Sequence, residues 1–147
     1  MAVDIEASTV INRAVGDVFR YVSNFENHPT WEKNFQQVRR LSATDSGVGT
    51  TYECVFKVPG QRVKATLEIT GYEPDRRIAF RADKPAMAKP VGEILFAPEG
   101  DSTRVTLRPR PELAGPMKLM APLMAGYVRR QNAHHLRLLK DQLEASS

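Results

Sequence analysis

The sequence predicts an α+β fold in which a curved antiparallel sheet of seven strands wraps around one long C-terminal helix. Two patterns support this prediction. Between residues 36 and 109, apolar and polar side chains alternate with a period of two, which is typical of half-buried strands. From about Pro116 to Ala145, apolar residues recur every three or four positions, as on one face of a helix. That face must be buried, and the sheet is the only large partner for it.

The start of the chain is expected to form one strand and two short helices. Residues 2–12 alternate loosely between apolar and polar side chains, which indicates the first strand. Apolar residues at helical spacing predict a helix over Ala14–Ser23. The pair His28-Pro29 favours an extended turn, and a second helix is expected at Thr30–Lys33 with Thr30 as its N-cap.

The middle of the chain is expected to form the remaining strands. The clearest is Arg62–Thr70, where Val63, Leu67 and Ile69 alternate with charged or polar residues. The other expected strands are Gln36–Ala43, Thr50–Val58, Arg77–Arg81, Val91–Ala97 and Thr103–Pro109. A strongly twisted sheet of this size curls around the helix, so a space can remain between the two.

One polar residue lies within the apolar stripe of the long helix. The stripe consists of Ala125, Val128, Asn132, Leu136, Leu139 and Leu143. A buried amide without a hydrogen-bond partner costs about 1–3 kcal/mol, so Asn132 is expected to be paired. Either it faces a cavity and binds a ligand oxygen or a water molecule, or it binds the sheet backbone. Pro122 is expected to kink or break the first part of the helix.

Four segments carry a family resemblance: Ala14–Asn34, Gly71–Phe80, Gly100–Leu107 and Gly126–Glu144. Their order resembles that of the helix-grip proteins, the START-related or SRPBCC superfamily. Within it the chain is similar to the bacterial polyketide cyclase/dehydrase and lipid-transport-like group. The resemblance implies a Bet v 1/START-like fold with an apolar cavity, in a single domain over residues 1–147. It does not imply one activity, because some members cyclise polyketides and others carry hydrophobic ligands.

Three functions follow as hypotheses. The first is binding or transport of a small hydrophobic molecule, such as a lipid, a polyketide or an isoprenoid-like compound, without chemical change. The second is a cofactor-independent polyketide cyclase, aromatase or dehydratase, with Asn132, His135 and Tyr52 as candidate catalytic residues. The third is a protein-interaction or toxin-type partner domain, in which side chains would fill the cavity.

The cavity wall is expected to combine aromatic strand residues with residues of the long helix. For Trp31 and for each strand residue, an ordinary place in the core is the favoured alternative. The expected ligand-binding residues are Trp31, Phe35, Tyr52, Phe56, Leu67, Phe80, Phe96, Met120, Met124, Val128 and Asn132.

No metal site and no cofactor are expected. His134 and His135 are adjacent, so on a helix they point about 100° apart and cannot bind one metal together. The sequence contains no HExxH or paired CxxC motif, P-loop, nucleophile elbow or dinucleotide fingerprint. His135 lies three residues from Asn132 and could border the same cavity, but no neighbour in the sequence identifies it as a general base.

The distribution of charge and the single cysteine limit which partners and which cellular compartment are expected. The net charge is +4, but the basic residues are scattered, so no nucleic-acid partner is expected. Cys54 is the only cysteine and is expected to be a small buried side chain, which fits a reducing, cytoplasmic compartment. The N-terminus carries no signal-peptide pattern.

The methionine-rich segment Met117–Met124 is expected to form an adaptable apolar surface. Methionine suits surfaces that take variable apolar partners, so this segment could gate the cavity, touch a membrane transiently or cap the core. The longest apolar stretch, Leu113–Val128, is shorter than the ~20 residues of a membrane-spanning helix. The chain is expected to be a monomer or a homodimer.

Overall fold

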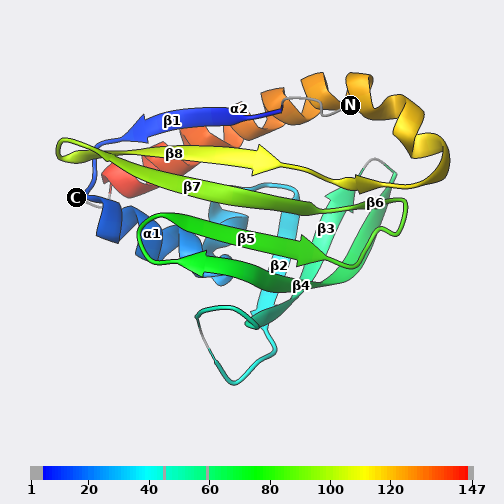
Figure 1. Cartoon of the computed structure of the whole chain (residues 1–147), viewed down its shortest axis with the longest axis horizontal. Helices are drawn as coiled ribbons and strands as arrows, with labels where there is room; N and C mark the ends of the chain where they lie inside the picture. The colour runs from blue at the N-terminus through cyan, green and yellow to red at the C-terminus, as the bar shows by residue number, and fades with distance from the viewer. Residues whose placement is uncertain (1–4, 45, 59, 146–147) are drawn as a thin grey trace.

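The computed structural model describes residues 5–44, 46–58 and 60–145, and its main feature is a seven-stranded antiparallel sheet with a long C-terminal helix (Figure 1). The strands of this sheet are β1 (Ala7–Ile11), β2 (Phe35–Arg40), β3 (Thr51–Val58), β4 (Gln61–Glu73), β5 (Arg77–Ala82), β7 (Val91–Glu99) and β8 (Ser102–Pro109). The helices are α1 (Val15–Ser23), the 3-10 helix η1 (Phe25–Thr30), the 3-10 helix η2 (Gly115–Met120) and α2 (Ala121–Ala145).

The sheet is an antiparallel meander, and the first strand of the chain forms one of its edges. Its order is β1-β8-β7-β5-β4-β3-β2, so the N-terminal strand pairs with the last long strand and α1 and η1 carry the chain across to the opposite edge. Figure 1 shows α2 running behind β1 and β8, along one side of the curved sheet. The predicted α+β architecture is therefore confirmed.

Strand β4 shows why the alternating pattern is a reliable signal. Ala65, Leu67 and Ile69 are buried, whereas Thr66 and Glu68 between them are exposed. The register shifts after Ile69 in the β4–β5 pair, and a second shift follows Phe35 in the β2–β3 pair. Such bulges bend the bulged strand and increase the local twist, which helps the sheet to curl.

The second short helix lies earlier than the sequence predicts. It is not at Thr30–Lys33: η1 covers Phe25–Thr30, and its cap is Asn24, whose side chain accepts a hydrogen bond from the Glu26 amide (3.1 Å). The expected extended turn at His28-Pro29 is also wrong. The His28 ring is buried and donates from Nε2 to the Val22 carbonyl (2.9 Å), so tertiary burial overrides the local preference.

Two further elements have other bounds than predicted, and one small sheet was not predicted. The strand expected at Gln36–Ala43 ends at Arg40. The C-terminal helix is 3-10 over Gly115–Met120 and α-helical only from Ala121, so Pro122 lies in the first turn of the α-helical part, where proline is best tolerated. No sequence pattern indicated the small sheet that pairs β6 (Ala88–Lys89) with β9 (Glu112–Leu113).

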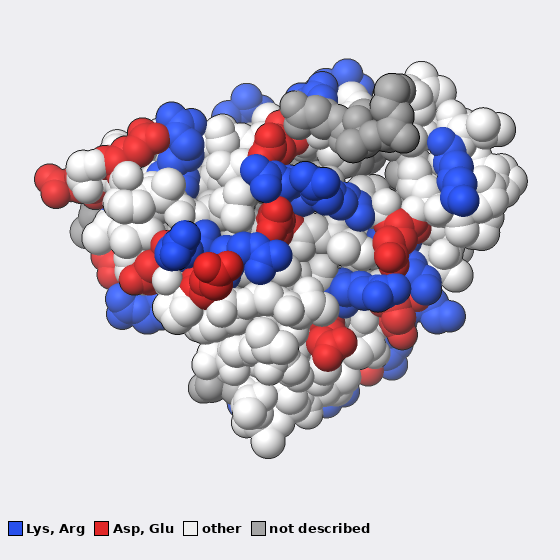
Figure 2. Space-filling model, viewed as in Figure 1, with Lys and Arg blue, Asp and Glu red and all other residues white. Residues whose placement is uncertain are grey.

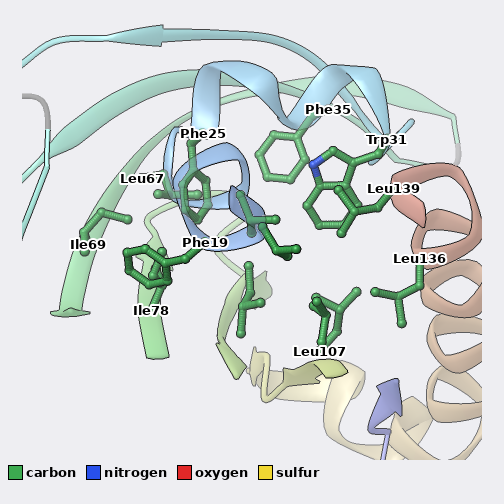
Figure 3. Packing of buried hydrophobic residues seen from close by; sticks show 14 of the residues in the cluster. Phe19, Phe25, Trp31, Phe35, Leu67, Ile69, Ile78, Leu107, Leu136 and Leu139 are labelled. Atoms are coloured by element: carbon green, nitrogen blue, oxygen red, sulfur yellow. The ribbon is translucent and has the colours of Figure 1, made fainter. Parts of the chain in front are cut away.

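The core lies between the sheet and the helices. Buried apolar side chains of α1, η1, α2 and the strands form one cluster, in which Trp31, Leu67 and Leu139 are completely buried. Figure 3 shows Leu136 and Leu139 projecting from α2 toward this cluster. Packing within this cluster attaches α2 to the sheet and sets the orientation of the helix relative to the strands.

The outer face of the sheet carries interleaved charges. Figure 2 shows basic and acidic side chains side by side on this face. Glu93 of β7 accepts hydrogen bonds from Arg77 (2.6 Å) and Arg108 (3.0 Å), and Arg108 also contacts Glu6 (2.6 Å). Burial alone would raise the pKa of Glu93, but the two guanidinium groups lower it. Such pairing is typical of a solvated sheet surface.

No helix in the part of the chain that the structure describes is both long and apolar enough to cross a membrane.

Candidate functional site

A pocket of about 420 Å³ lies between the middle of α2 and the end of the β3–β4 hairpin. Three parts of the chain form the pocket: the segment that follows η1, the end of the β3–β4 hairpin, and residues 127–135 of α2. The lining residues are Lys33, Asn34, Lys57, Gly60, Tyr127, Val128, Gln131, Asn132 and His135.

The helix contributes its residues through simple periodicity. Val128, Asn132 and His135 are spaced by four and three positions, so they lie on one helical face. Tyr127 and Gln131 lie beside that face, and the Gln131 side-chain amide donates to the Tyr127 hydroxyl (3.0 Å). The helix therefore presents the apolar Val128 beside four side chains that can form hydrogen bonds to a ligand.

The opposite wall depends on strand pairing. Phe35 of β2 pairs with Phe56 of β3, and the Lys57 amide donates to the Asn34 carbonyl (2.7 Å). This register brings Lys33 and Asn34 next to Lys57, although the two segments lie far apart in the sequence. Gly60 has a φ of +85°, in the left-handed region that glycine adopts without strain, so it allows the tight turn at the pocket edge.

His135 is the most unusual residue of the pocket. Its side chain lines the pocket, yet the residue is only 3% exposed, and its Nδ1 has no hydrogen-bond partner among the described residues. Burial lowers the pKa of His135; Glu32 opposes this effect, whereas His134 and Lys33 add to it. The imidazole is therefore neutral near pH 7, when one ring nitrogen donates and the other accepts.

A buried aromatic group lies on η1 and in the segment after it. His28 stacks on Phe25 (ring centroids 3.9 Å apart) and lies 4.8 Å from the Trp31 ring. Within the described ranges, the Trp31 indole N–H and His28 Nδ1 form no hydrogen bond, although Glu32 lies 3.5 Å from that His28 nitrogen. This segment thus combines apolar packing with polar atoms that protein groups do not fully satisfy.

The structure brings three of the expected site residues together. Val128, Asn132 and His135 line the pocket, which corresponds to the first alternative for Asn132, a side chain that faces a cavity. Met120 is 44% exposed and Met124 half-buried near the start of α2, and neither lines this pocket. The remaining expected ligand-binding residues lie in or against the apolar core: Trp31, Phe35, Tyr52, Phe56, Leu67, Phe80 and Phe96. Their contact with a ligand stays a prediction.

Sequence reasoning missed several lining residues. Tyr127 and Gln131 flank the helical stripe at the same spacing as its own members, so the periodicity could have revealed them. Lys33 and Lys57 gave no such signal, because they meet only through the register of β2 and β3.

Cys54 and the acidic side chains do not form a chemical centre. Cys54 is buried as predicted, and burial, with smaller effects of Glu32 and Glu53, raises the pKa of its thiol to about 12. No group of three or more His, Cys, Asp or Glu residues that could hold a metal ion occurs in the described segments. The chemistry available at the pocket is therefore hydrogen bonding, charge and proton exchange at His135.

Comparison with known proteins identifies the family of this chain. The family model described as polyketide cyclase/dehydrase and lipid transport matches residues 2–144. A search of the curated proteins finds no match.

Several solved structures share the fold. TTHA0849 from Thermus thermophilus is 22% identical, with a TM-score of 0.80 and 99% of both chains covered. The Zhui aromatase/cyclase from Streptomyces sp. R1128 is 15% identical, with a TM-score of 0.75 and coverage of 97% of this chain and 93% of that one. A START superfamily protein from Mycobacterium smegmatis is 18% identical, with a TM-score of 0.73 and coverage of 97% and 98%. At these identities the likeness shows the fold alone, and it confirms the predicted helix-grip, START-like fold.

Proposed function

Because the chain belongs to the polyketide cyclase/dehydrase and lipid transport family, we propose that it binds a small, largely apolar molecule in the pocket beside α2. The single observation that carries this proposal is the joint lining of that pocket by Val128, Asn132 and His135. These residues combine an apolar wall with two groups that can orient a ligand oxygen, and a few placed polar groups in an apolar setting are typical of ligand sites.

The size of the pocket supports the same proposal. Its volume of about 420 Å³ falls within the roughly 300–1,000 Å³ range of small-molecule sites. The fully buried Leu139 and Trp31 belong to the core cluster that supports α2, and such a rigid backing lowers the ordering cost of binding.

The proposal is tested by native mass spectrometry of protein purified from its own source, followed by extraction and identification of bound compounds. A single hydrophobic compound that co-purifies with the protein is the expected result. In parallel, Val128→Trp should fill the pocket and abolish binding of that compound. Ala133→Trp, on the same helix but exposed, is the matched control and should bind normally. Equal binding by both variants would reject this pocket as the site.

Cyclisation or dehydration of a polyketide is the second candidate function. The observation that favours it is the lowered pKa of His135 at the pocket, because a neutral imidazole can take a proton from an acidic C–H between two carbonyl groups. Asn132 would then hold a keto oxygen, and Tyr52 stays a third candidate although it is buried in the core.

A poly-β-keto mimic distinguishes the two functions. The wild-type protein and the variants Asn132→Leu, His135→Phe and Tyr52→Phe are incubated with the mimic, and the products are analysed by chromatography. Recovery of unchanged mimic from the wild type, together with measurable binding, favours the carrier function. Product formation that is lost in His135→Phe but kept in Tyr52→Phe favours the cyclase with His135 as its base.

We further propose a transient membrane contact through Met117–Met124. Two leucines of this segment are strongly exposed, with Leu119 at 84% and Leu123 at 72%. Sedimentation with anionic phosphatidylglycerol vesicles should pull down the wild type more strongly than the variant Leu119→Ser/Leu123→Ser. Equal sedimentation of both proteins would reject this contact.

A cytoplasmic location, the absence of a nucleic-acid partner and a monomeric or homodimeric state likewise stay predictions.

A further inference from the structure

The charge of the pocket lining is one-sided. Lys33 and Lys57 both contribute to the lining, and no described lining residue is acidic. The other polar side chains there include the amides Asn34, Gln131 and Asn132, which can donate hydrogen bonds to an anion. A ligand in this pocket therefore meets two positive charges and several donors.

Lys33 and Lys57 differ from three arginines of the sheet. On the sheet, Arg77, Arg104 and Arg108 each pair with a glutamate at 2.6 Å. Among the described residues, neither Lys33 nor Lys57 forms an ion pair with a carboxylate. No direct ion pair within the described residues therefore neutralises these two positive charges, and positive charge around a concave surface attracts anions.

His135 is a further polar residue of the lining. It is only 3% exposed, it lines the pocket, and its Nδ1 has no hydrogen-bond partner in the described part of the chain. Buried polar atoms in proteins are nearly always paired, so this nitrogen keeps an unused capacity for a hydrogen bond in a residue that lines the pocket.

We infer that the ligand of this pocket is an amphiphile with an anionic group, such as a carboxylate or a phosphate ester, held by Lys33 and Lys57. This inference rests on the proposed binding function and names the class of ligand. The anionic group lies against the two lysines, and the apolar part lies against Val128 and the Tyr127 ring. A small molecule is favoured over an acidic protein surface, because the pocket volume of about 420 Å³ suits a small molecule.

Three probes with the same ten-carbon tail test the inference by isothermal titration calorimetry: decanoate, decyl phosphate and decan-1-ol. At low salt, decanoate and decyl phosphate should each bind about tenfold more tightly than decan-1-ol, because charged hydrogen bonds are stronger than neutral ones. The double variant Lys33→Gln/Lys57→Gln should bind both anions only about as tightly as the alcohol. Both lysines are exposed, so this variant is expected to fold.

The control variant Lys84→Gln/Lys118→Gln loses the same net charge at exposed residues that do not line the pocket, and it should keep the preference for anions. A preference for one anion over the other identifies its source as carboxylate or phosphate. Equal affinity of the wild type for all three probes, or anion binding unchanged in the Lys33→Gln/Lys57→Gln variant, would overturn the inference and leave the proposed function intact. Failure of all three probes to bind would count against both.

Discussion

The two halves of α2 have the same helical geometry but very different surroundings. In the C-terminal half, Leu136, Leu139 and Leu143 are between 0% and 4% exposed. In the N-terminal half Ala125 is the one buried residue among those described, and Leu123 is 72% exposed. One half of the helix is part of the core, whereas the other is free to form a binding surface.

Polar contacts strengthen the attachment of the C-terminal half. The Lys140 ammonium donates to the Val10 carbonyl (2.8 Å) and contacts Glu144 (2.6 Å), and the Arg13 guanidinium donates to the Leu143 carbonyl (2.6 Å). The pocket residues from Tyr127 to His135 lie where the anchored half meets the exposed half. The C-terminal half of α2 therefore fixes the position of the helix, and the pocket beside residues 127–135 stays open.

Leu139→Ala should have the largest effect on stability. Leu139 is completely buried, and truncation of such a leucine costs about 2–5 kcal/mol through lost apolar burial and the cavity left behind. The free energy of unfolding, measured by urea denaturation, should fall by this amount. Leu123→Ala in the exposed half is the control and should change it by less than about 0.5 kcal/mol. Similar losses in the two variants would contradict the difference between the halves.

Lys140→Met should have a smaller effect. It keeps the aliphatic stem but removes the hydrogen bond to the Val10 carbonyl and the contact with Glu144. A net hydrogen bond contributes about 0.5–1.5 kcal/mol, and the free energy of unfolding should fall by that amount. Arg137→Met, one helical turn away at an exposed position, should have no measurable effect. If both variants match the wild type, packing alone anchors the C-terminal half.

The sequence was sufficient to predict the elements that the period of apolar residues defines. The alternation at Ala65, Leu67 and Ile69 predicted β4, and the stripe from Ala125 to Leu143 predicted the buried face of α2. Both patterns are local, since each follows from burying one side of a regular backbone. The stripe also pointed to Asn132, because an amide among leucines needs a partner.

The rest of the site depends on contacts between distant segments. The position of η1 follows from the burial of Phe25 and His28 against the sheet, which local turn rules do not contain. Lys33 and Lys57 line the same pocket because Phe35 pairs with Phe56, and strand register is a tertiary property. Sequence reasoning therefore found three residues of the helical wall, Val128, Asn132 and His135, and missed the opposite wall, which carries the positive charge.

The pH dependence of stability tests the residue at the junction of the two halves. Burial lowers the pKa of His135 below its ordinary value of 6.5, so on acidification the unfolded chain binds a proton at this site before the folded protein does. His135 therefore has no effect on stability above pH 6.5 and lowers it as the pH falls from 6.5 through the folded pKa. The charged groups Glu32, Lys33 and His134 act on this pKa, and the buried His28 is common to all variants compared.

The free energy of unfolding at about pH 7.5 and about pH 5.5, on either side of the ordinary histidine pKa, is measured for the wild type, His135→Gln and His134→Gln. The drop between the two pH values should be smaller in His135→Gln than in the wild type. His134→Gln, altered at an exposed position, removes only a minor cause of the lowered pKa and should retain most of the drop. An equal drop in all three proteins would mean that His135 is protonated as easily when folded as when unfolded. The pocket would then be wet enough to solvate a charge, and the boundary between the anchored and the exposed half of α2 would lie C-terminal to His135.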